Sequence, residues 1–339
     1  MNKSNKDIKI LITGNAGMIG TVLSRYFLNQ GYNVVGIDNL SEGYQENLFP
    51  KESRTYFHDI TDLESIDRIF KEEKPHFVIN CAAEAAEILS SFIRGFTYKS
   101  NIIGTANVIN CCVNHNVKKI IHFSSIARYG NGIPPFTEQS PINPLEPYGF
   151  SKVLNEWDLK EAYEHFGLKY NVLTCFNVAS KYQNFYSKYR NALAIFIRQS
   201  ILGENITLYG DGLQKRSFSD AKYICDPIQK LLFGELYNTQ NFNLGSSQPI
   251  TLLEAAQLIQ KEANKRGYNP SIIHLEPRKE VRVAYCNTTK AKELLEFEDK
   301  TDLLSLISEM FDYALITPKR EIKTRNYEIE KELYSFWKK

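Results

Sequence analysis

The sequence of 339 residues has no excess of charge of either sign. Lysine and arginine number 41 against 39 acidic residues, which gives a formal net charge of +2. Nucleic-acid and membrane-surface binders usually carry a basic excess or a basic cluster. The balance therefore predicts neither kind of partner and favours chemistry on small molecules.

Long apolar runs and paired cysteines are also missing. No apolar span reaches 18 residues, and the polar start "MNKSNKDIKI" has no signal-peptide core, so we expect a cytoplasmic protein. The six cysteines include no CxxC pair and mostly lie in apolar runs. This pattern predicts reduced core thiols and neither disulfides nor a metal site.

What the sequence does contain is a regular alternation of short apolar runs and helical patterns through its first half. The runs are "IKILIT", "YNVVGID", "HFVINCAA" and "KKIIHFSS", separated by helices expected from Met18, from Asp62 and near Asn101. Several runs are apolar almost throughout, as in strands buried on both faces. The rhythm predicts an α/β fold with a doubly wound parallel sheet.

The second half of the sequence has a looser pattern. A helix is expected from Tyr148 to about His165 and a strand at "KYNVLTCFNV", which together complete a first domain over residues 1–179. A strand near 241–246 is expected to return to its sheet, and residues 180–240 and 265–339 are expected to form a smaller lobe. The last 25 residues are highly charged with interspersed aromatics. They predict a solvated terminal helix, with a subunit contact as the alternative.

A glycine-rich loop follows the first predicted strand. In "ILITGNAGMIG", Gly14, Gly17 and Gly20 lie between a strand and a helix, where glycines let backbone N–H groups approach a pyrophosphate. The second strand ends at Asp38, 18 residues after Gly20. A carboxylate there accepts hydrogen bonds from an adenosine ribose and repels a 2′-phosphate. The loop therefore predicts NAD as cofactor in preference to NADP.

A second motif places a phenol beside an ammonium group. Tyr148 and Lys152 are four residues apart in "EPYGFSK", so they share one face of the predicted helix. A nearby cation favours the ionised phenol, and we expect Lys152 to lower the pKa of Tyr148. Ser125, in "FSSIARYG", stands at the end of the predicted strand "KKIIHFSS". This is the carboxyl edge, where open α/β sheets bind their ligands.

In their order, these motifs resemble the extended short-chain dehydrogenases/reductases, the sugar-nucleotide epimerase/dehydratase family. The resemblance covers about residues 8–300 and includes "HDITD", "NCAA" and "NLGS" besides the motifs above. It implies a Rossmann-type domain that binds NAD and a smaller lobe that binds a nucleoside-diphosphate sugar. It also implies a homodimer joined through the helices that begin near Asn101 and Tyr148.

The resemblance assigns roles to individual positions. It makes Ser125, Tyr148 and Lys152 the catalytic set. The cofactor-binding positions that it implies are Gly14, Gly17, Met18, Ile19, Gly20, Asp38, Asn39, Ser41, Asp59, Ile60, Ala82, Ala83, Asn101, Tyr148 and Lys152. The substrate-binding positions are Ser124, Ser125, Asn177, Asn191, Arg216, Arg278, Glu280 and Ala284, with Arg282 as an alternative to Arg278. Arg128 could be a surface substitution or a further substrate contact.

The implied chemistry is oxidation of a sugar alcohol. Tyr148 would accept the hydroxyl proton and Ser125 would hydrogen-bond the same oxygen. Relatives that eliminate water carry an acidic pair where this sequence has Ile126 and Ala127. With no acid or base expected beyond the tyrosine, we expect epimerisation at carbon 4, most simply of a uridine-linked hexose. A net dehydrogenase and a non-catalytic nucleotide-binding module stay open. Ala284 would leave room for an N-acetyl group at carbon 2 of the sugar.

Overall fold

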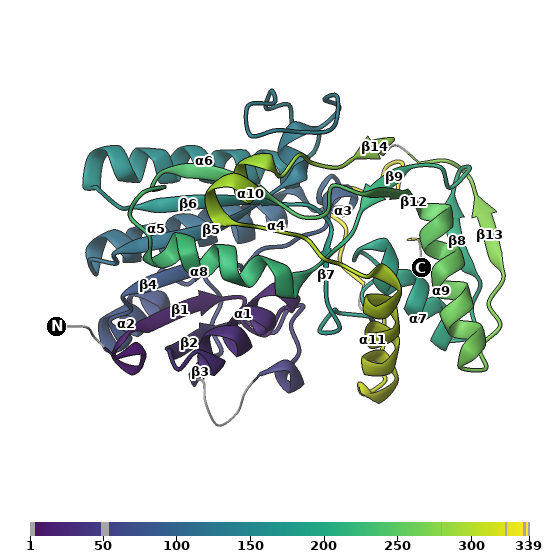
Figure 1. The fold of residues 1–339 in the computed structure, drawn as a ribbon, viewed down its shortest axis with the longest axis horizontal. Helices are drawn as coiled ribbons and strands as arrows, with labels where there is room; N and C mark the ends of the chain where they lie inside the picture. The colour runs from purple at the N-terminus through teal and green to yellow at the C-terminus, as the bar shows by residue number, and fades with distance from the viewer. Residues whose placement is uncertain (1–3, 49–53, 279, 323, 335–336, 338–339) are drawn as a thin grey trace.

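A seven-stranded parallel sheet forms the larger part of the computed structural model, which describes residues 4–48, 54–278, 280–322, 324–334 and 337 (Figure 1). Every neighbouring pair of strands is parallel. The strand order is β11 (Gln240–Leu244), β6 (Tyr170–Cys175), β5 (Lys119–Ser125), β4 (Phe77–Asn80), β1 (Lys9–Thr13), β2 (Asn33–Ile37) and β3 (Arg54–Tyr56). This arrangement confirms the predicted α/β class with a Rossmann-type sheet.

Helices cover both faces of the sheet, because alternate side chains of a strand point to opposite faces. Ile10 and Ile12 of β1 belong to one buried cluster and Leu11 to another. The first cluster includes α1 (Met18–Asn29), α8 (Cys225–Phe233) and α10 (Thr289–Leu295). The second includes α2 (Leu63–Glu73), α5 (Gly104–Asn114) and α6 (Pro147–Phe166). The central strands are therefore buried on both sides.

Helix α6 brings the phenol of Tyr148 to the edge of the sheet. Pro147 occupies its first turn, where a missing N–H has no cost, and Gly167 ends it with φ +73°. Short elements fill the space beside it, and they are α3 (Glu87–Ser90), α4 (Arg94–Tyr98), η3 (Lys99–Ile103) and η4 (Ile126–Tyr129). Tyr148 is thus the second residue of a long, well-terminated helix.

A second lobe packs beside the carboxyl edge of the sheet (Figure 1). Its helices are α7 (Ala192–Ile201), α9 (Leu252–Lys265) and α11 (Leu303–Ile316), which share one apolar cluster. Its strands are β8 (Ile206–Tyr209), β13 (Ile272–Leu275), β9 (Lys215–Ser217), β12 (Pro249–Thr251) and β14 (Val283–Ala284). The remaining short elements are η1 (Asn5–Asp7), η2 (Gln45–Asn47), η5 (Ala221–Ile224), β7 (Val178–Ala179) and β10 (Ser219–Asp220).

The packing divides the chain differently from the expected 180–240 and 265–339. Helix α9, which falls between those ranges, buries Ala255, Ala256, Ile259 and Ala263 in the second lobe. These residues form an i, i+1, i+4, i+8 stripe, so the helix needs an apolar partner. Helices α8 and α10 lie inside the expected lobe ranges but pack on the sheet.

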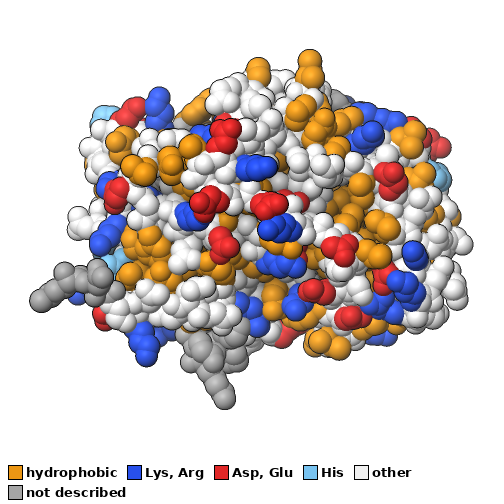
Figure 2. All heavy atoms as spheres, in the orientation of Figure 1, with side chains coloured by type: hydrophobic (Ala, Val, Ile, Leu, Met, Phe, Trp, Pro, Cys, Tyr) orange, Lys and Arg blue, Asp and Glu red, His pale blue; other side chains and the backbone are white. Residues whose placement is uncertain are grey.

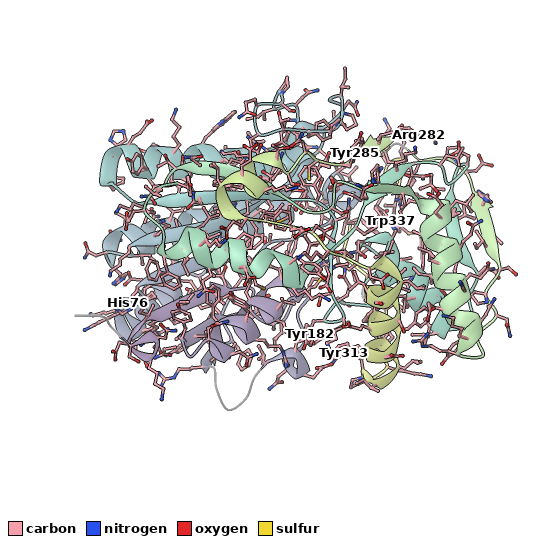
Figure 3. All side chains as sticks on the ribbon, viewed as in Figure 1. His76, Tyr182, Arg282, Tyr285, Tyr313 and Trp337 are labelled. Atoms are coloured by element: carbon pink, nitrogen blue, oxygen red, sulfur yellow. The ribbon has the colours of Figure 1, made fainter. Side chains whose placement is uncertain are left out.

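The described part of the last 25 residues is not the solvated helix that its charge predicted. Helix α11 ends at Ile316, and the chain then returns to the sheet domain without further α-helix among its described residues. Glu328 accepts the N–H groups of Gly95 and Phe96 at 2.7 and 2.8 Å. Leu333 and Trp337 pack against Ala86, Leu89 and Ile93, and Figure 3 shows Trp337 between the two lobes. Aromatic burial therefore outweighs the charged composition.

Arg325 ties this returning segment to two loops at the edge of the sheet. Its Nη2 donates to Glu42 Oε1 at 2.8 Å and to Glu84 Oε2 at 2.6 Å. Arg190 of the second lobe pairs with Glu42 at 2.8 Å. The two lobes and the C-terminal segment therefore meet in one partly buried ionic network.

The face of the molecule in Figure 2 carries charges of both signs, with basic and acidic side chains interspersed. None of the helices in the described residues combines the length and apolarity needed to cross a membrane. All six cysteines carry free thiols, and four of them are buried.

Candidate active site

Ser125, Tyr148 and Lys152 converge at the carboxyl end of β5. Ser125 is the last residue of that strand, and its Oγ accepts the N–H of Ala127 at 3.2 Å. The Lys152 ammonium lies 5.6 Å from the centre of the Tyr148 ring. It donates to the carbonyl of Phe123 at 2.7 Å. The three side chains predicted to act together therefore lie together.

Burial dominates the charge state of this set. Burial raises the pKa of Tyr148, a hydrogen bond from Ser125 lowers it, and the charges of Glu87 and Glu146 raise it further. Burial also lowers the pKa of Lys152, to about 8. Without a bound cofactor the net pKa of Tyr148 is therefore raised, because desolvation dominates, and a lowering by Lys152 together with the nicotinamide cation stays a prediction.

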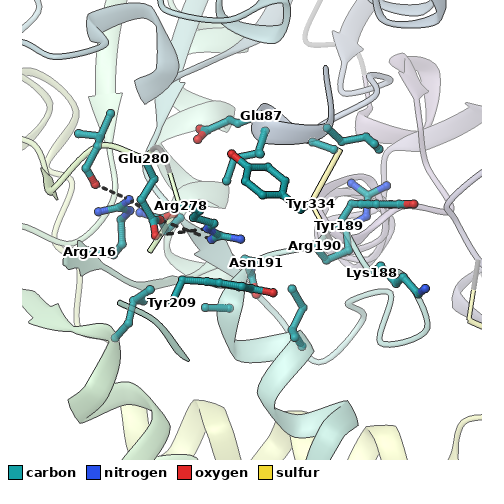
Figure 4. Close-up of a pocket in the computed structure, with 18 of the residues that line it drawn as sticks. Glu87, Lys188, Tyr189, Arg190, Asn191, Tyr209, Arg216, Arg278, Glu280 and Tyr334 are labelled. Atoms are coloured by element: carbon teal, nitrogen blue, oxygen red, sulfur yellow. Dashed lines mark hydrogen bonds and ion pairs between the residues drawn. The ribbon is translucent and has the colours of Figure 1, made fainter. Parts of the chain in front are cut away.

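A cavity of about 800 Å³ opens between the two lobes and reaches Tyr148 (Figure 4). Its sheet-domain wall includes Glu87, Ala127 and Glu146, and its opposite wall comes from the second lobe. Tyr334 and Trp337 of the C-terminal segment also line it. A cleft of this size, with a few polar groups, is typical of a small-molecule site.

Two arginines stand on the second-lobe side of the cavity, held by one carboxylate. Arg216 and Arg278 approach Glu280 at 3.4 and 3.3 Å, and Gln214 donates to Glu280 at 2.9 Å. The Arg278 guanidinium also stacks 4.3 Å from the Tyr209 ring. Paired guanidinium groups suit a diphosphate, which they contact through parallel N–H donors.

Arg282, the alternative to Arg278, lies outside this cavity. It makes a two-point ion pair with Asp211 at 2.7 Å for both contacts. Figure 3 shows it at the outer edge of the second lobe. The geometry therefore favours Arg278 as the phosphate ligand.

Two asparagines and an alanine complete the predicted substrate side. Asn177 lines the cavity with φ 36°, and its Nδ2 is buried with no partner among the described residues. Asn191 also lines it and caps α7 by accepting the N–H of Ala194 at 3.2 Å. Ala284 lies in the wall on β14 and is 6% exposed. The unpartnered Asn177 amide is a donor that a ligand oxygen could satisfy.

Ser124 and Arg128 do not reach the cavity. The Ser124 hydroxyl donates to Glu156 Oε1, and Arg128 pairs with Glu156 Oε2 at 2.8 Å. The Arg128 and Glu156 side chains are 6% and 9% exposed. The structure therefore makes Arg128 half of a buried ion pair beneath the active site, and it directs Ser124 to that pair and away from the substrate.

The glycine loop after β1 has the shape that a dinucleotide requires. A Cβ at Gly20 would lie 2.1 Å from the Gly14 carbonyl oxygen, and Gly14 adopts φ +68°. Helix α1 begins directly afterwards with no side-chain cap, so N–H groups of its first turn, which includes Met18 and Ile19, are left for a ligand. These residues fit a pyrophosphate.

Asp38 is fixed beside this loop. It accepts the N–H of Ala16 at 2.9 Å and that of Leu40 at 2.8 Å, which leaves further lone pairs for a ribose. Burial raises its pKa, and these hydrogen bonds lower it. Asn39 donates to Asp59 at 2.8 Å and accepts the N–H of Ser41 at 2.9 Å. The predicted adenosine-side residues form one connected network.

The other predicted cofactor positions are more structural. The N–H of Ala82, which precedes Ala83, donates to the Thr13 hydroxyl. Ile60 packs in the apolar cluster that includes α5. Asn101 is 1% exposed, and its amide bonds the backbone of Glu84 and the Ser151 hydroxyl. Asn101 therefore fixes the loop after β4 and does not present its amide to a ligand.

The sequence interpretation missed two cavity carboxylates near Tyr148, Glu87 and Glu146. Glu146, two residues before Tyr148, has its pKa raised to about 7 by burial and by the charge of Glu87. Glu87 lines the cavity, and its side chain is exposed there. Desolvation by the surrounding protein nevertheless raises its pKa. The expectation of no acid or base beyond the tyrosine is therefore wrong.

Comparisons with known proteins agree with this geometry. A family model described as the NAD dependent epimerase/dehydratase family matches residues 10–245. A putative UDP-glucose 4-epimerase of Methanocaldococcus jannaschii is 30% identical over 84% of this chain and 92% of its own.

Two solved structures are also similar. The UDP-glucose 4-epimerase of Thermotoga maritima with UDP-glucose has a TM-score of 0.85 at 30% identity, covering 91% of this chain and 99% of that one. The UDP-glucose 4-epimerase of Thermus thermophilus with NAD has a TM-score of 0.83 at 26% identity, over 90% and 98% of the chains.

Proposed function

This chain belongs to the NAD-dependent epimerase/dehydratase family, and we propose that it epimerises a nucleoside-diphosphate sugar at carbon 4 through a transient 4-keto sugar. The observation that carries the proposal is the arrangement of one cavity. Tyr148 lies in its wall on the sheet-domain side, and Arg216 and Arg278 line the second-lobe side. A sugar joined to a diphosphate matches these two chemistries.

Tyr148, Ser125 and Lys152 have separate roles in proton transfer and positioning. NAD, when bound, supplies the acceptor for the hydrogen that leaves carbon 4 with its electron pair. Tyr148 takes the proton of the carbon-4 hydroxyl, and Ser125 hydrogen-bonds the same oxygen. Lys152 stabilises the phenolate form of Tyr148 that accepts this proton. Rotation of the keto sugar in the cavity exposes its other face, and Tyr148 returns the proton when carbon 4 is reduced.

Elimination of water is the second candidate reaction. Ile126 and Ala127, which follow Ser125, offer no proton transfer, and this favours epimerisation. Glu87 and Glu146 nevertheless place two carboxyl groups near Tyr148, as their effects on its pKa show. Removing a proton beside a ketone and protonating a leaving hydroxyl need such groups.

One experiment tests these reactions together. The protein is incubated with uridine-, guanosine-, cytidine- and thymidine-linked sugars, the products are resolved by NMR, and absorbance is followed at the NADH band. Carbon-4 epimers without net NADH support the proposal. A 6-deoxy-4-keto product identifies a dehydratase, stoichiometric NADH identifies a net dehydrogenase, and no turnover of any sugar identifies a binding module.

Replacing Ala284 by tyrosine should selectively depress turnover of N-acetylhexosamine substrates. Ala284 lies in the cavity wall, so the added ring would fill the space that an N-acetyl group needs. We expect kcat/KM to fall about tenfold or more for the N-acetylated sugar and little for the plain hexose, since steric exclusion acts on the larger group. Ala284→Ser is the matched control, and equal losses on both substrates would reject the idea.

A homodimer should form through α5 and α6. Phe150, Leu154 and Trp157 of α6 are 39%, 42% and 61% exposed, and Ile103 before α5 is 52% exposed. Apolar residues gathered on neighbouring helices favour burial by a second copy. Light scattering after gel filtration should give twice the chain mass, and Trp157→Glu should shift it to the monomer. A wild-type monomer at micromolar concentration would contradict the proposal.

A further inference from the structure

Glu87 is fixed next to the backbone of Tyr148 by a short chain of hydrogen bonds. The Ser90 hydroxyl donates to the Glu87 carbonyl at 2.6 Å and accepts the N–H of Tyr148 at 3.1 Å. Helix α3, which carries both Glu87 and Ser90, is therefore tied directly to the start of α6. The Glu87 side chain lines the same cavity as Tyr148.

The other side of α3 is held by the C-terminal segment. Leu89 is 1% exposed and packs in one cluster with Leu333 and Trp337. Because these contacts bury the apolar side of α3, the Glu87 side chain is left on the cavity side, as Figure 4 shows. The position of this carboxylate is thus set from both sides.

The charges that face Glu87 come from three parts of the chain. They are Glu146 and Tyr148 at the start of α6, Arg216 of β9, and Arg278 and Glu280 of the loop before β14. Both arginines already contact Glu280, and a bound diphosphate would engage them further. Three other cations line the cavity: Arg190 pairs with Glu42, Arg198 donates to the Ser187 carbonyl at 3.0 Å, and Lys188 points away from Glu87 in Figure 4. On the Tyr148 side of the cavity, the charged groups are therefore the carboxyls Glu87 and Glu146.

Resting on the proposed function, we propose that Glu87 is a specificity-determining residue that restricts the substrate to sugars without a carboxylate. A neutral hexose or N-acetylhexosamine offers hydroxyl and amide donors that a carboxylate accepts. A uronic acid would place a second negative charge in the same enclosed space, where like charges repel strongly. The family name specifies no sugar, so this assignment rests on the chain's own Glu87.

Binding of matched ligands tests this without requiring turnover. Dissociation constants for UDP, UDP-glucose and UDP-glucuronate are measured by calorimetry on the full chain loaded with NAD, for the wild type and for Glu87→Gln. We expect the wild type to bind UDP-glucuronate about tenfold or more weakly than UDP-glucose, and Glu87→Gln to shrink that ratio severalfold. Glu293→Gln, which removes an exposed charge of α10 outside the cavity, should leave the ratio at its wild-type value.

The ratio should also depend on pH with a defined sign. Burial raises the pKa of Glu87 above its ordinary value, so the carboxylate forms later as pH rises. Discrimination against UDP-glucuronate should therefore be larger at about pH 8.5 than at about pH 6. In Glu87→Gln the remaining pH dependence should be smaller and belong to Glu146, whose pKa stays raised by burial but loses the further rise that the Glu87 charge causes.

The outcomes separate this inference from the proposed function. The ligands are UDP-linked if the sugar panel gives turnover with uridine and otherwise carry the base that does; failure of the diphosphate and both sugars to bind with any of the four bases would remove the proposed function and the inference with it. Binding of both sugars with a ratio that Glu87→Gln leaves unchanged would overturn the inference alone. Loss of turnover in Glu87→Gln with an unchanged ratio would instead make Glu87 a proton-transfer group, which also overturns it.

Discussion

Replacing Tyr148 by phenylalanine should lower kcat about 1000-fold, within the 10²- to 10⁴-fold range typical for loss of a general base. The ring would keep its place in the wall of the cavity, because Tyr148 is 7% exposed and packed at the start of α6. Only the group that exchanges a proton with the carbon-4 oxygen is lost. Steady-state turnover of the best substrate from the sugar panel measures the effect.

The same variant should bind substrate and unfold almost as the wild type does. A dissociation constant for the sugar nucleotide within a few-fold of wild type would show that the loss is chemical. Tyr223→Phe is the matched control, because its hydroxyl donates to the Lys300 carbonyl at 3.0 Å, outside the cavity. Full activity in Tyr148→Phe would refute the catalytic assignment.

Replacing Arg128 by methionine should destabilise the protein by about 3–5 kcal/mol. The change leaves Glu156 buried with the Ser124 hydroxyl as its hydrogen-bond partner among the described residues and with the Lys152 charge nearby. Burial already raises the pKa of Glu156 and the Arg128 charge lowers it, so the uncompensated carboxyl would be protonated or rehydrated at a cost. The free energy of unfolding from urea titration measures the loss.

The double variant Arg128→Met with Glu156→Leu provides the control. Replacing both charges by apolar groups of similar size is often neutral, since no buried charge is left without a partner. We therefore expect the double variant to be more stable than Arg128→Met alone. If the single variant matched the wild type in stability, the Arg128–Glu156 ion pair would make no contribution to the free energy of unfolding.

The sheet and its ligand-binding edge could be predicted because they depend on local patterns. The apolar runs predicted six of the seven strands of the sheet, all but the short β3, and the glycine spacing predicted a loop whose Gly20 has no room for a Cβ. Tyr148 and Lys152 are one helical turn apart, so their joint position also followed from spacing. Local periodicity thus sufficed for the fold and for the catalytic helix.

Residues positioned by distant contacts could not be predicted in this way. Glu87 lies 61 positions before Tyr148, on a helix of four residues, and reaches the site only through Ser90. Arg128 was ambiguous because its partner Glu156 lies on another element. The C-terminal segment was misread because its charge pattern does not reveal that Leu333 and Trp337 pack against residues of α3 and its flanks.

The ionic network around Arg325 also has a consequence for how the site is completed during synthesis. Arg325 is 283 residues from Glu42 and 241 from Glu84, and Glu328 is 233 from Gly95. Contacts this far apart in sequence form slowly, and both lobes leave the ribosome before this segment does. The nascent chain therefore passes through a stage in which sheet and second lobe are folded while α3 lacks its backing. We therefore expect the wall that carries Glu87 to form after the sheet, so that, on the proposed role of Glu87, selectivity for the sugar matures after the ability to hold the nucleotide.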